Sequence, residues 1–391
     1  MPTTLVITND FPPTLGGIEA FIGQICGALG DVVVLTRRHP QAAAHDRALP
    51  FPIHRRSGLL LPTPATLRVA RQLMERHSAT RVVFGAAAPL GLLAPGLRRS
   101  GATHLLAISH GHETWWARLP IARALLRRIG DHVDAVSYIS GYTHAAIAPA
   151  LSPPARAAMV RLPPPVDPAR FRPQHEDLDG AHSGLATPDP GAAESVGRPN
   201  RHRPTVIAAG RFIHQKGFDT LLTAWARVLT AWPVGRPVPQ LVMVGDGPLR
   251  ATLQASVQRL PHPDSVRFTG PLPHASVPRE MARGDVFALP VRTRWWGLNP
   301  EGLGMVFVEA AACGLAVIAG RSGGTGDTLV PGESGVLVEP EDPETLAAHL
   351  LDLLTDLPRA RAMGAAGRAH VQEHFSPDTT AAVLRQVLDL G

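Results

Sequence analysis

The chain is poor in the features that mark several large protein classes. Its 391 residues include only two cysteines, Cys26 and Cys313. Both lie in apolar stretches, in different halves of the chain, which is typical of buried thiols in a reduced compartment and not of a disulfide framework. The first residues have neither the basic region nor the cleavage site of a signal peptide. The most apolar stretch, 82–97, contains two prolines and is shorter than the roughly 20 residues that span a bilayer. We therefore expect a cytoplasmic protein that at most rests on the inner face of the cell membrane.

Motifs of other nucleotide-dependent enzymes are missing as well. No G-x-G-x-x-G follows the first apolar run, so a nicotinamide-dependent dehydrogenase loses its main support. No G-x-x-x-x-G-K-[ST] occurs, which excludes a P-loop ATPase. The basic residues are scattered and no nucleic-acid-binding motif accompanies them, so we expect no nucleic-acid partner. The formal net charge of +6 suits either simple solubility or attraction to an anionic partner, such as a phosphate donor or an acidic lipid surface.

What the sequence does contain is an alternation of short apolar runs and amphipathic segments. Apolar runs that predict buried parallel strands occupy 5–8, 32–36, 82–85, 105–109, 206–209, 241–244, 266–269, 286–289, 316–319 and 335–338. Helical patterns fill the intervals, and three more follow the last run. Strands that alternate with helices predict βαβ units and doubly wound α/β sheets. We expect two Rossmann-like domains that face each other across a cleft, with ligands at the carboxyl ends of the strands.

The alternation stops between Pro173 and Pro204, where Pro, Gly, Ala, Ser, Asp and His predominate. Such a composition predicts a flexible linker or insertion. The predicted organisation has four parts: a first domain over 1–172, the linker over 173–204, a second domain over 205–375, and a C-terminal helix over 376–391 that is free to cross back to the first domain.

Two short motifs are suited to phosphate binding. Gly16-Gly17 opens a helix after the first strand, where backbone N–H groups can approach an anion, although a simple turn explains the pair equally well. Arg211 and Lys216 flank the turn after the first strand of the second domain. Two cations at one strand end can converge on a diphosphate; the alternative is a pair of solvated surface cations.

Glu301 and Glu309 bracket a glycine-containing segment that opens another helix, with Gly302, Leu303 and Gly304 next to the first carboxylate. Eight residues of helix rise about 12 Å, whereas the carboxylates of glycosidases lie roughly 5–9.5 Å apart. The pair is therefore poorly placed for hydrolysis and better placed to contact the two ends of one extended ligand.

Two further features leave alternatives open. His110-Gly111-His112 follows a predicted strand, and such a pair is half of the metal site of a hydrolase, a sugar contact or a support for the backbone there. The helical pattern 121–129 carries Arg123, Arg127 and Arg128 beside apolar residues. It predicts a helix that covers the sheet, or one that docks on anionic headgroups at a membrane surface.

Taken together, these motifs resemble glycosyltransferase family 4 over nearly the whole chain. The resemblance is carried by Gly16-Gly17-Ile18-Glu19, by Arg211 with Lys216-Gly217, by 244–248, by Glu301 to Glu309 and by Gly323-Gly324. Within the family the chain is most similar to the branch that transfers mannose from GDP-mannose to phosphatidylinositol mannosides. Segments 8–13, 84–89, 110–113 and 290–294 carry that similarity. Departures are Pro164-Pro165, Trp295-Trp296 and Gly326-Asp327.

The resemblance implies a fold, a reaction and a set of roles. It implies the GT-B type of glycosyltransferase fold and a retaining hexosyl transfer without a catalytic metal or other cofactor. Arg211 and Lys216 would neutralise the leaving diphosphate, which Gly16 and Gly17 would also approach. Glu301 with Gly302, Leu303 and Gly304 would hold the sugar, Glu309 the ribose, and His112, with His110 nearby, the mannose close to the reacting carbon. The remaining alternatives are another nucleotide-sugar donor, a soluble acceptor, a metal-dependent hydrolase and a non-catalytic binding protein.

Overall fold

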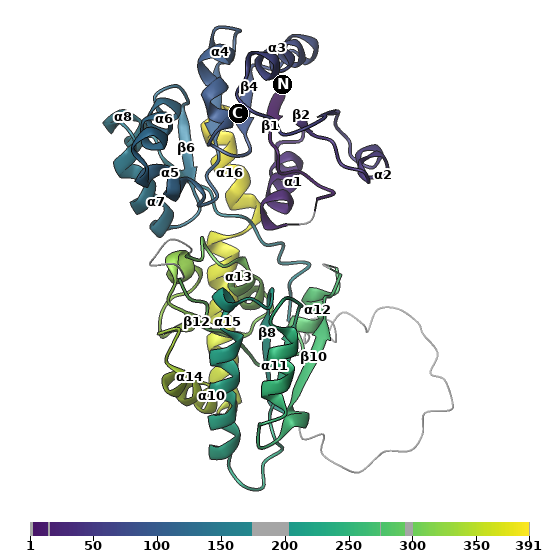
Figure 1. Cartoon of the computed structure of the whole chain (residues 1–391), viewed down its shortest axis with the longest axis vertical. Coiled ribbons are helices and arrows are strands. Elements are labelled where there is room, and N and C mark those ends of the chain that lie inside the picture. The colour runs from purple at the N-terminus through teal and green to yellow at the C-terminus, as the bar shows by residue number, and fades with distance from the viewer. Residues whose placement is uncertain (1–2, 15, 174–202, 274, 294–299, 391) are drawn as a thin grey trace. The chain divides into compact units, whose positions relative to one another are not determined.

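The computed structural model of the chain describes residues 3–14, 16–173, 203–273, 275–293 and 300–390. Most of the linker predicted over 173–204, and Trp295-Trp296, lie outside these residues. The chain divides into two compact units, Met1–Pro165 with Phe375–Gly391 and Val166–His374. Each unit has a parallel sheet with helices on both faces (Figure 1). The first boundary follows Pro165 and not residue 172, and the last helix belongs to the first unit.

The first unit contains a seven-stranded sheet in the order β3-β2-β1-β4-β5-β6-β7, with every neighbouring pair parallel. Its strands are β1 (Thr4–Ile7), β2 (Val32–Arg37), β3 (Ile53–Arg56), β4 (Arg81–Phe84), β5 (His104–Ala107), β6 (Ala135–Tyr138) and β7 (Val160–Arg161). The predicted runs correspond to β1, β2, β4 and β5, whereas β3, β6 and β7 were missed.

Nine α-helices of the first unit surround this sheet within the described residues: α1 (Gly17–Leu29), α2 (Ala42–Arg47), α3 (Pro64–His77), α4 (Ala94–Arg98), α5 (Glu113–Arg118), α6 (Pro120–Gly130), α7 (Gly141–Ile147), α8 (Pro153–Ala157) and α16 (Pro377–Leu388). Short 3-10 turns lie at η1 (Leu90–Leu93) and η2 (Ala148–Ala150). Because strand side chains alternate between faces, Leu5 and Ile7 join the cluster under α3, α4 and α6, while Val6 joins the cluster under α1 and α16. The two cores therefore sandwich one sheet.

The last helix is fixed to the first unit by both apolar and polar contacts. Leu384 and Leu388 of α16 are buried beside residues of α1. The guanidinium of Arg81, at the start of β4, donates to the carbonyl oxygen of Leu388 at 2.6 Å. Together these contacts tie the end of the chain to a central strand of the first sheet.

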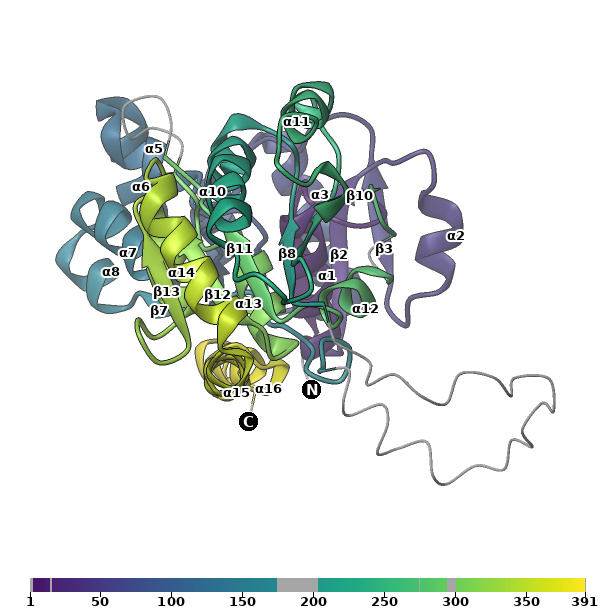
Figure 2. The same cartoon turned by 90° about the horizontal axis from the view of Figure 1, so that it is seen from below.

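The second unit has a six-stranded parallel sheet in the order β10-β9-β8-β11-β12-β13. Its strands are β8 (Thr205–Ala209), β9 (Gln240–Val244), β10 (Val266–Gly270), β11 (Val286–Leu289), β12 (Ala316–Gly320) and β13 (Gly335–Val338). The described helices are α10 (Phe218–Ala231), α11 (Arg250–Val257), α12 (Val277–Met281), α13 (Met305–Ala312), α14 (Pro343–Thr355) and α15 (Leu357–His374), with 3-10 turns η4 (His214–Lys216), η5 (Pro263–Ser265) and η6 (Gly323–Thr328). Figure 2 shows α14 and α10 over the strands of this unit.

The order of the second sheet places the loops after β8, β11 and β12 side by side at its carboxyl edge. These loops carry Lys216, Thr293 and Ser322. Among the residues that the structure describes, no helix combines the length and the apolar character needed to cross a membrane.

Candidate functional site

In the second unit, the loop after β8 brings a cation to a carboxylate from a distant segment. Lys216, in η4, donates from Nζ to Oε2 of Glu301 at 2.7 Å. The side chains are 19% and 17% exposed, so the ion pair is partly withdrawn from water. Lys216 is also the only lysine among the 38 Lys and Arg residues of the chain. The neighbouring Gln215 donates to the carbonyl oxygen of Pro300 at 3.3 Å and so ties the two segments together a second time.

Ser322 fixes the backbone of Glu301. Its Oγ accepts from the backbone N–H of Glu301 at 3.2 Å and lies 2.8 Å from Oγ1 of Thr293. The N–H of Gly324 donates to the carbonyl oxygen of Glu301 at 2.9 Å. Since Ser322 is only 3% exposed, this hydroxyl is an interior junction between the loops that follow β11 and β12.

Gly323 sits in the left-handed region, with φ at +53°, and a Cβ there would lie 2.1 Å from the carbonyl oxygen of Glu301. Both the backbone conformation and the contact require glycine. Gly304 is the N-cap of α13 with φ at +89°. Gly302 and the buried Leu303 complete the turn that carries the chain from Glu301 into the helix.

Glu309 lies within α13, the helix that follows Gly304. Its carboxylate has no hydrogen-bond or ion-pair partner within the described chain. Burial raises the pKa of Glu309 to about 7, and the charge of Arg170 opposes that shift. A partly buried carboxylate without a donor is ready to accept hydrogen bonds from ligand hydroxyls.

Arg211, the other predicted cation, is exposed just after Gly210. No carboxylate of the described residues pairs with its guanidinium. The structure therefore assembles Lys216, Glu301, Gly302, Leu303 and Gly304, and leaves the predicted Arg211 and Glu309 unpaired in the same unit.

In the first unit, Gly16 and Gly17 are exposed at the N-terminus of α1. A Cβ on Gly17 would meet nothing within 4 Å, whereas one on Gly16 would lie 2.1 Å from Oε2 of Glu19. The carboxylate of Glu19 thus turns back over the start of the helix, where the N–H groups favour negative charge. An anion that binds here has to displace it.

His110 lies in the loop after β5, and its side chain points toward the loop after β4. Its Nε2 lies 2.5 Å from the carbonyl oxygen of Gly85, so the neutral ring carries its proton on Nε2. Burial lowers the pKa of His110, with the charge of Glu113 acting in the other direction. The ring also contacts Phe21 of α1 edge to face, with centroids 5.8 Å apart. His110 therefore fixes the loop beside α1.

Glu113 is a buried carboxylate to which the sequence reasoning assigned no role. Although 1% exposed, its carboxylate accepts from Oγ of Ser109 at 3.0 Å, from the N–H of His110 at 3.2 Å and from the N–H of Ala88 at 3.5 Å. It stabilises the segment that presents His112, which is exposed as the N-cap of α5. The sequence feature that could have indicated this role is its position directly after His112.

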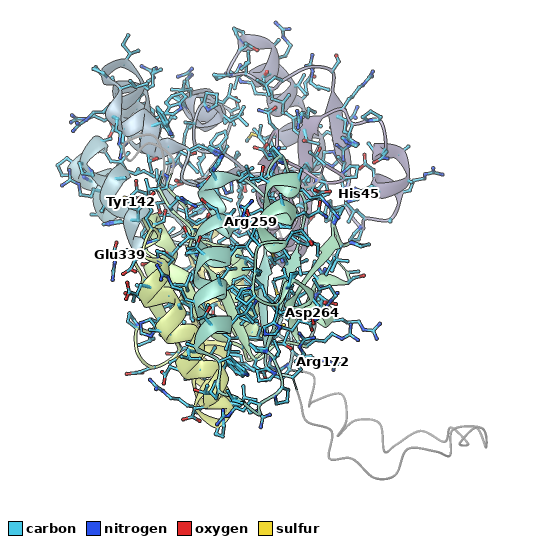
Figure 3. The ribbon with its side chains drawn as sticks, turned by 60° about the horizontal axis from the view of Figure 1, so that its bottom comes forward. His45, Tyr142, Arg172, Arg259, Asp264 and Glu339 are labelled. Atoms are coloured by element: carbon cyan, nitrogen blue, oxygen red, sulfur yellow. The ribbon has the colours of Figure 1, made fainter. Side chains whose placement is uncertain are left out.

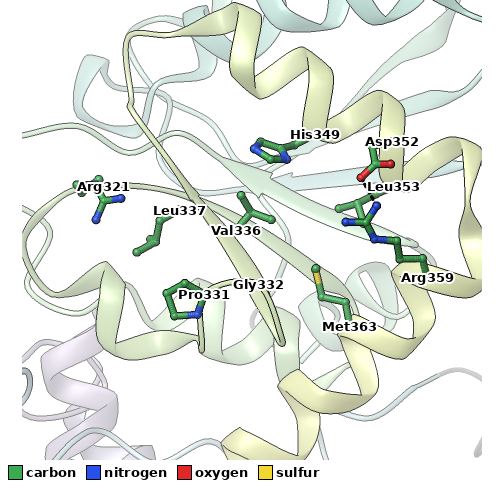
Figure 4. Close-up of a pocket in the computed structure, with 10 residues that line it drawn as sticks. All are labelled: Arg321, Pro331, Gly332, Val336, Leu337, His349, Asp352, Leu353, Arg359 and Met363. Carbon is green, nitrogen blue, oxygen red and sulfur yellow. Dashed lines mark hydrogen bonds and ion pairs between the residues drawn. The ribbon is translucent and has the colours of Figure 1, made fainter.

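The described residues contain no group of three or more His, Cys, Asp or Glu side chains that could hold a metal ion. A cavity of about 310 Å³ in the second unit lies elsewhere (Figure 4). Its lining includes Arg321 and Arg359, but Arg321 pairs with Glu339, labelled in Figure 3, at 2.9 Å, and Arg359 with Asp352 at 2.7 Å. Because both cations are neutralised, this cavity is less suited to a diphosphate than the segment around Lys216.

Comparison with known proteins decides the family. The glycosyl transferases group 1 family matches residues 193–370. The GDP-mannose-dependent alpha-(1-6)-phosphatidylinositol monomannoside mannosyltransferase of Mycobacterium tuberculosis (strain ATCC 25618 / H37Rv) is 40% identical over 399 residues, which cover 99% of this chain and 98% of that protein. The chain belongs to the glycosyltransferase group 1 family. The GDP-mannose-dependent monoacylated alpha-(1-6)-phosphatidylinositol monomannoside mannosyltransferase of Corynebacterium glutamicum is 37% identical, with 95% and 94% of the two chains covered.

Solved structures support the fold of this group 1 glycosyltransferase. Anabaena Alr3699/HepE in complex with UDP has a TM-score of 0.77 at 18% identity and covers 100% of both chains. WaaG, a glycosyltransferase involved in lipopolysaccharide biosynthesis, has a TM-score of 0.60 at 18% identity and covers 97% of this chain and 99% of its own. The predicted GT-B fold with two Rossmann-like domains is confirmed. The predicted family and the prediction that the chain is a mannosyltransferase are confirmed as well. The hydrolase alternative finds no support, and the roles of individual residues stay predictions.

Proposed function

We propose that this glycosyltransferase transfers mannose from GDP-mannose to a phosphatidylinositol mannoside, with retention of the anomeric configuration. The observation that carries the proposal is the similarity, over nearly the whole chain, to enzymes whose names state this donor and this acceptor class. The site chemistry is consistent with it, because the second unit has cations for a diphosphate and carboxylates for hydroxyl groups.

The donor is assigned to the second unit, residue by residue. Lys216 and Arg211 neutralise the diphosphate, and Glu301 with the turn from Gly302 to Gly304 holds the mannose. Glu309 accepts from the ribose hydroxyls. The ammonium of Lys216 is paired with Glu301, and we expect donor binding to replace that pair with two separate contacts, one to phosphate and one to sugar.

Transfer is proposed to need no metal ion. The two cations stabilise the charge that develops on the leaving diphosphate, which is the part that a metal plays in many phosphate reactions. Support comes from the exposed and unpaired guanidinium of Arg211 and from the partly buried ammonium of Lys216. Full activity in excess EDTA is the expected result, and loss of activity that Mg²⁺ or Mn²⁺ restores would contradict it.

The first unit is assigned to the acceptor and to a membrane surface. His112, exposed at the start of α5, is the proposed contact to the transferred mannose. Near it, Trp115, Leu119 and Ile121 are 42%, 56% and 80% exposed, which is unusual for large apolar side chains. Arg127 and Arg128 project from the next helix, α6, and are exposed as well.

We infer that α6 docks on anionic lipid through these side chains. A variant with Arg123, Arg127 and Arg128 changed to glutamine should co-sediment less with anionic vesicles than the wild type. Substitution of Arg259 and Arg279, exposed arginines of the second unit, is the control and should leave binding unchanged. Equal sedimentation of all three proteins would refute docking by α6.

The function is tested by a transfer assay read by mass spectrometry. Purified protein receives GDP-mannose or UDP-glucose, phosphatidylinositol monomannoside in anionic vesicles, and EDTA. One added hexose from GDP-mannose alone is the expected result. Release of GDP without a lipid product would keep the donor and point to another acceptor. Transfer from UDP-glucose in preference to GDP-mannose would overturn the donor assignment.

A further inference from the structure

Two arginines lie side by side at the carboxyl ends of β2 and β3. Arg37 and Arg56 are register partners in the parallel ladder, and the N–H of the adjoining Arg38 donates to the carbonyl oxygen of Arg56 at 2.7 Å. Register partners project from the same face of a sheet. Two positive charges therefore face each other at the edge of the sheet where ligands of such folds bind.

Neither of these arginines has a carboxylate partner among the described residues. The nearby carboxylate is already engaged: Asp46 accepts from the neighbouring Arg55 at 2.7 and 2.8 Å, and it also contacts His45, labelled in Figure 3. Arg37 is half-buried and Arg56 is exposed. Like charges directly opposite each other destabilise a sheet, and a bound anion would remove that repulsion.

The loop that follows β3 displays two leucines next to this pair. Leu59 is 61% exposed and Leu61 is 45% exposed, whereas Leu60 between them is 2% exposed. The amide of Asn9 holds Leu60 on both sides, by donating to its carbonyl oxygen at 3.0 Å and accepting from its N–H at 2.8 Å. Because Leu60 is anchored, its two neighbours are presented outward by a fixed backbone.

We propose that Arg37 and Arg56 form a binding site for the phosphodiester of the lipid acceptor, and that Leu59 and Leu61 contact the start of its acyl part. Guanidinium groups bind phosphate oxygens in a two-pronged geometry. Apolar side chains beside such a site suit a phospholipid better than a soluble anion. The inference rests on the proposed function and deepens it, because it locates the acceptor's charge on the first unit.

The test is a double variant, Arg37→Gln with Arg56→Gln, assayed for mannose transfer. The KM for phosphatidylinositol monomannoside should rise roughly tenfold or more, while the KM for GDP-mannose stays within about twofold of the wild type. Arg76→Gln is the matched control, since Arg76 is an exposed arginine without an ion pair in the described chain. Arg76 lies in the last turn of α3, from which the chain runs into the amino end of β4. It is therefore at the amino edge of the sheet, whereas Arg37 and Arg56 are at the carboxyl edge. An unchanged acceptor KM in the double variant would overturn the proposal.

Folding is checked separately. Because the double variant removes a repulsion, its thermal midpoint should equal or exceed that of the wild type. A clearly lower midpoint would mean that the two arginines stabilise the fold, and would count against a ligand role.

A second experiment measures lipid binding and does not depend on mannose transfer. Water-soluble short-chain phosphatidylinositol, below its micelle concentration, is titrated calorimetrically into each protein without a membrane. The double variant should bind it roughly tenfold or more weakly than the wild type and Arg76→Gln. If the wild type transfers no mannose, the proposed function fails and this experiment still decides the site. Equal binding by all proteins would overturn the site, and inorganic phosphate that binds as tightly as the lipid would overturn its assignment to a phospholipid.

Discussion

Substitution of Lys216 by alanine gives the sharpest test of the proposed donor site. Its Nζ lies 2.7 Å from Glu301 in a pair whose side chains are 19% and 17% exposed. In a site shielded from water, loss of one group that stabilises a developing negative charge lowers kcat about 10²- to 10³-fold, or about 2.7–4 kcal/mol in the barrier. We expect a loss of this size for transfer from GDP-mannose.

Loss of Lys216 should also lower the stability of the protein. Without Lys216, Glu301 keeps a partly buried carboxylate with no cation, and an unsatisfied charged group of this kind costs about 1–3 kcal/mol or more. The double variant Lys216→Ala with Glu301→Gln should therefore recover stability but not turnover. A double-mutant cycle on thermal unfolding and on kcat separates the two effects.

The assay follows GDP release and the mass of the lipid product under saturating donor and acceptor. Arg259→Ala, which removes one exposed positive charge from the same unit, is the control and should remain close to wild type. The assignment would be refuted if Lys216→Ala kept near-normal kcat. A defect confined to the KM for GDP-mannose would keep Lys216 in the proposed donor site but refute its role in stabilising the leaving diphosphate, because binding lost equally from ground state and transition state leaves kcat unchanged.

Three further predictions concern the groups around this pair. Because burial raises the pKa of Glu309 from 4.5 to about 7, folding favours its neutral form, so this group should lower the free energy of unfolding as pH rises between those values. The KM for GDP-mannose should fall as the pH rises through 7, and Glu309→Gln should abolish both trends in pH-resolved denaturation and kinetics. Ser322→Ala should leave the N–H of Glu301 unsatisfied, cost about 1–3 kcal/mol of stability and raise the donor KM, with recovery in Ser322→Thr; an unchanged donor KM would contradict the positioning role. Gly323→Ala should lower the thermal midpoint more than Gly332→Ala, since both have positive φ but only the first Cβ meets a backbone atom; equal shifts would refute the steric part.

Most of the strands that the sequence predicted are buried over nearly their whole length; β10 and β13 are the exceptions, and β6 was missed although three of its four residues are buried. In β1 and β2, continuous Val, Ile and Leu runs reflect burial by helices on each side. β3 escaped prediction because its sequence is Ile-His-Arg-Arg and it lies at the edge of its sheet, where burial no longer selects apolar residues. The two-residue β7, at the other edge of the sheet, was missed for the same reason.

The site was predictable where a motif is local and not where distant loops converge. Spacing alone indicated Lys216 and the segment from Glu301 to Gly304, but not that these meet in an ion pair 85 residues apart in the chain. Ser322 gave no signal of its own, since its role arises from the adjacency of the loops after β11 and β12. Glu113 stood within a recognised motif, yet only its burial separates it from a solvated carboxylate.

That Lys216 is the only lysine makes the proposed donor site open to selective chemical modification. A reagent that acylates amines finds one ε-amino group in the whole molecule, besides the α-amino group. Its side chain is 19% exposed and paired with Glu301, so the rate of acylation reports directly on that pair. A diphosphate bound at the same ammonium should protect it. The mass of the peptide that contains Lys216, read after a brief exposure and digestion, would then give the fraction of molecules that hold a donor, without any substitution.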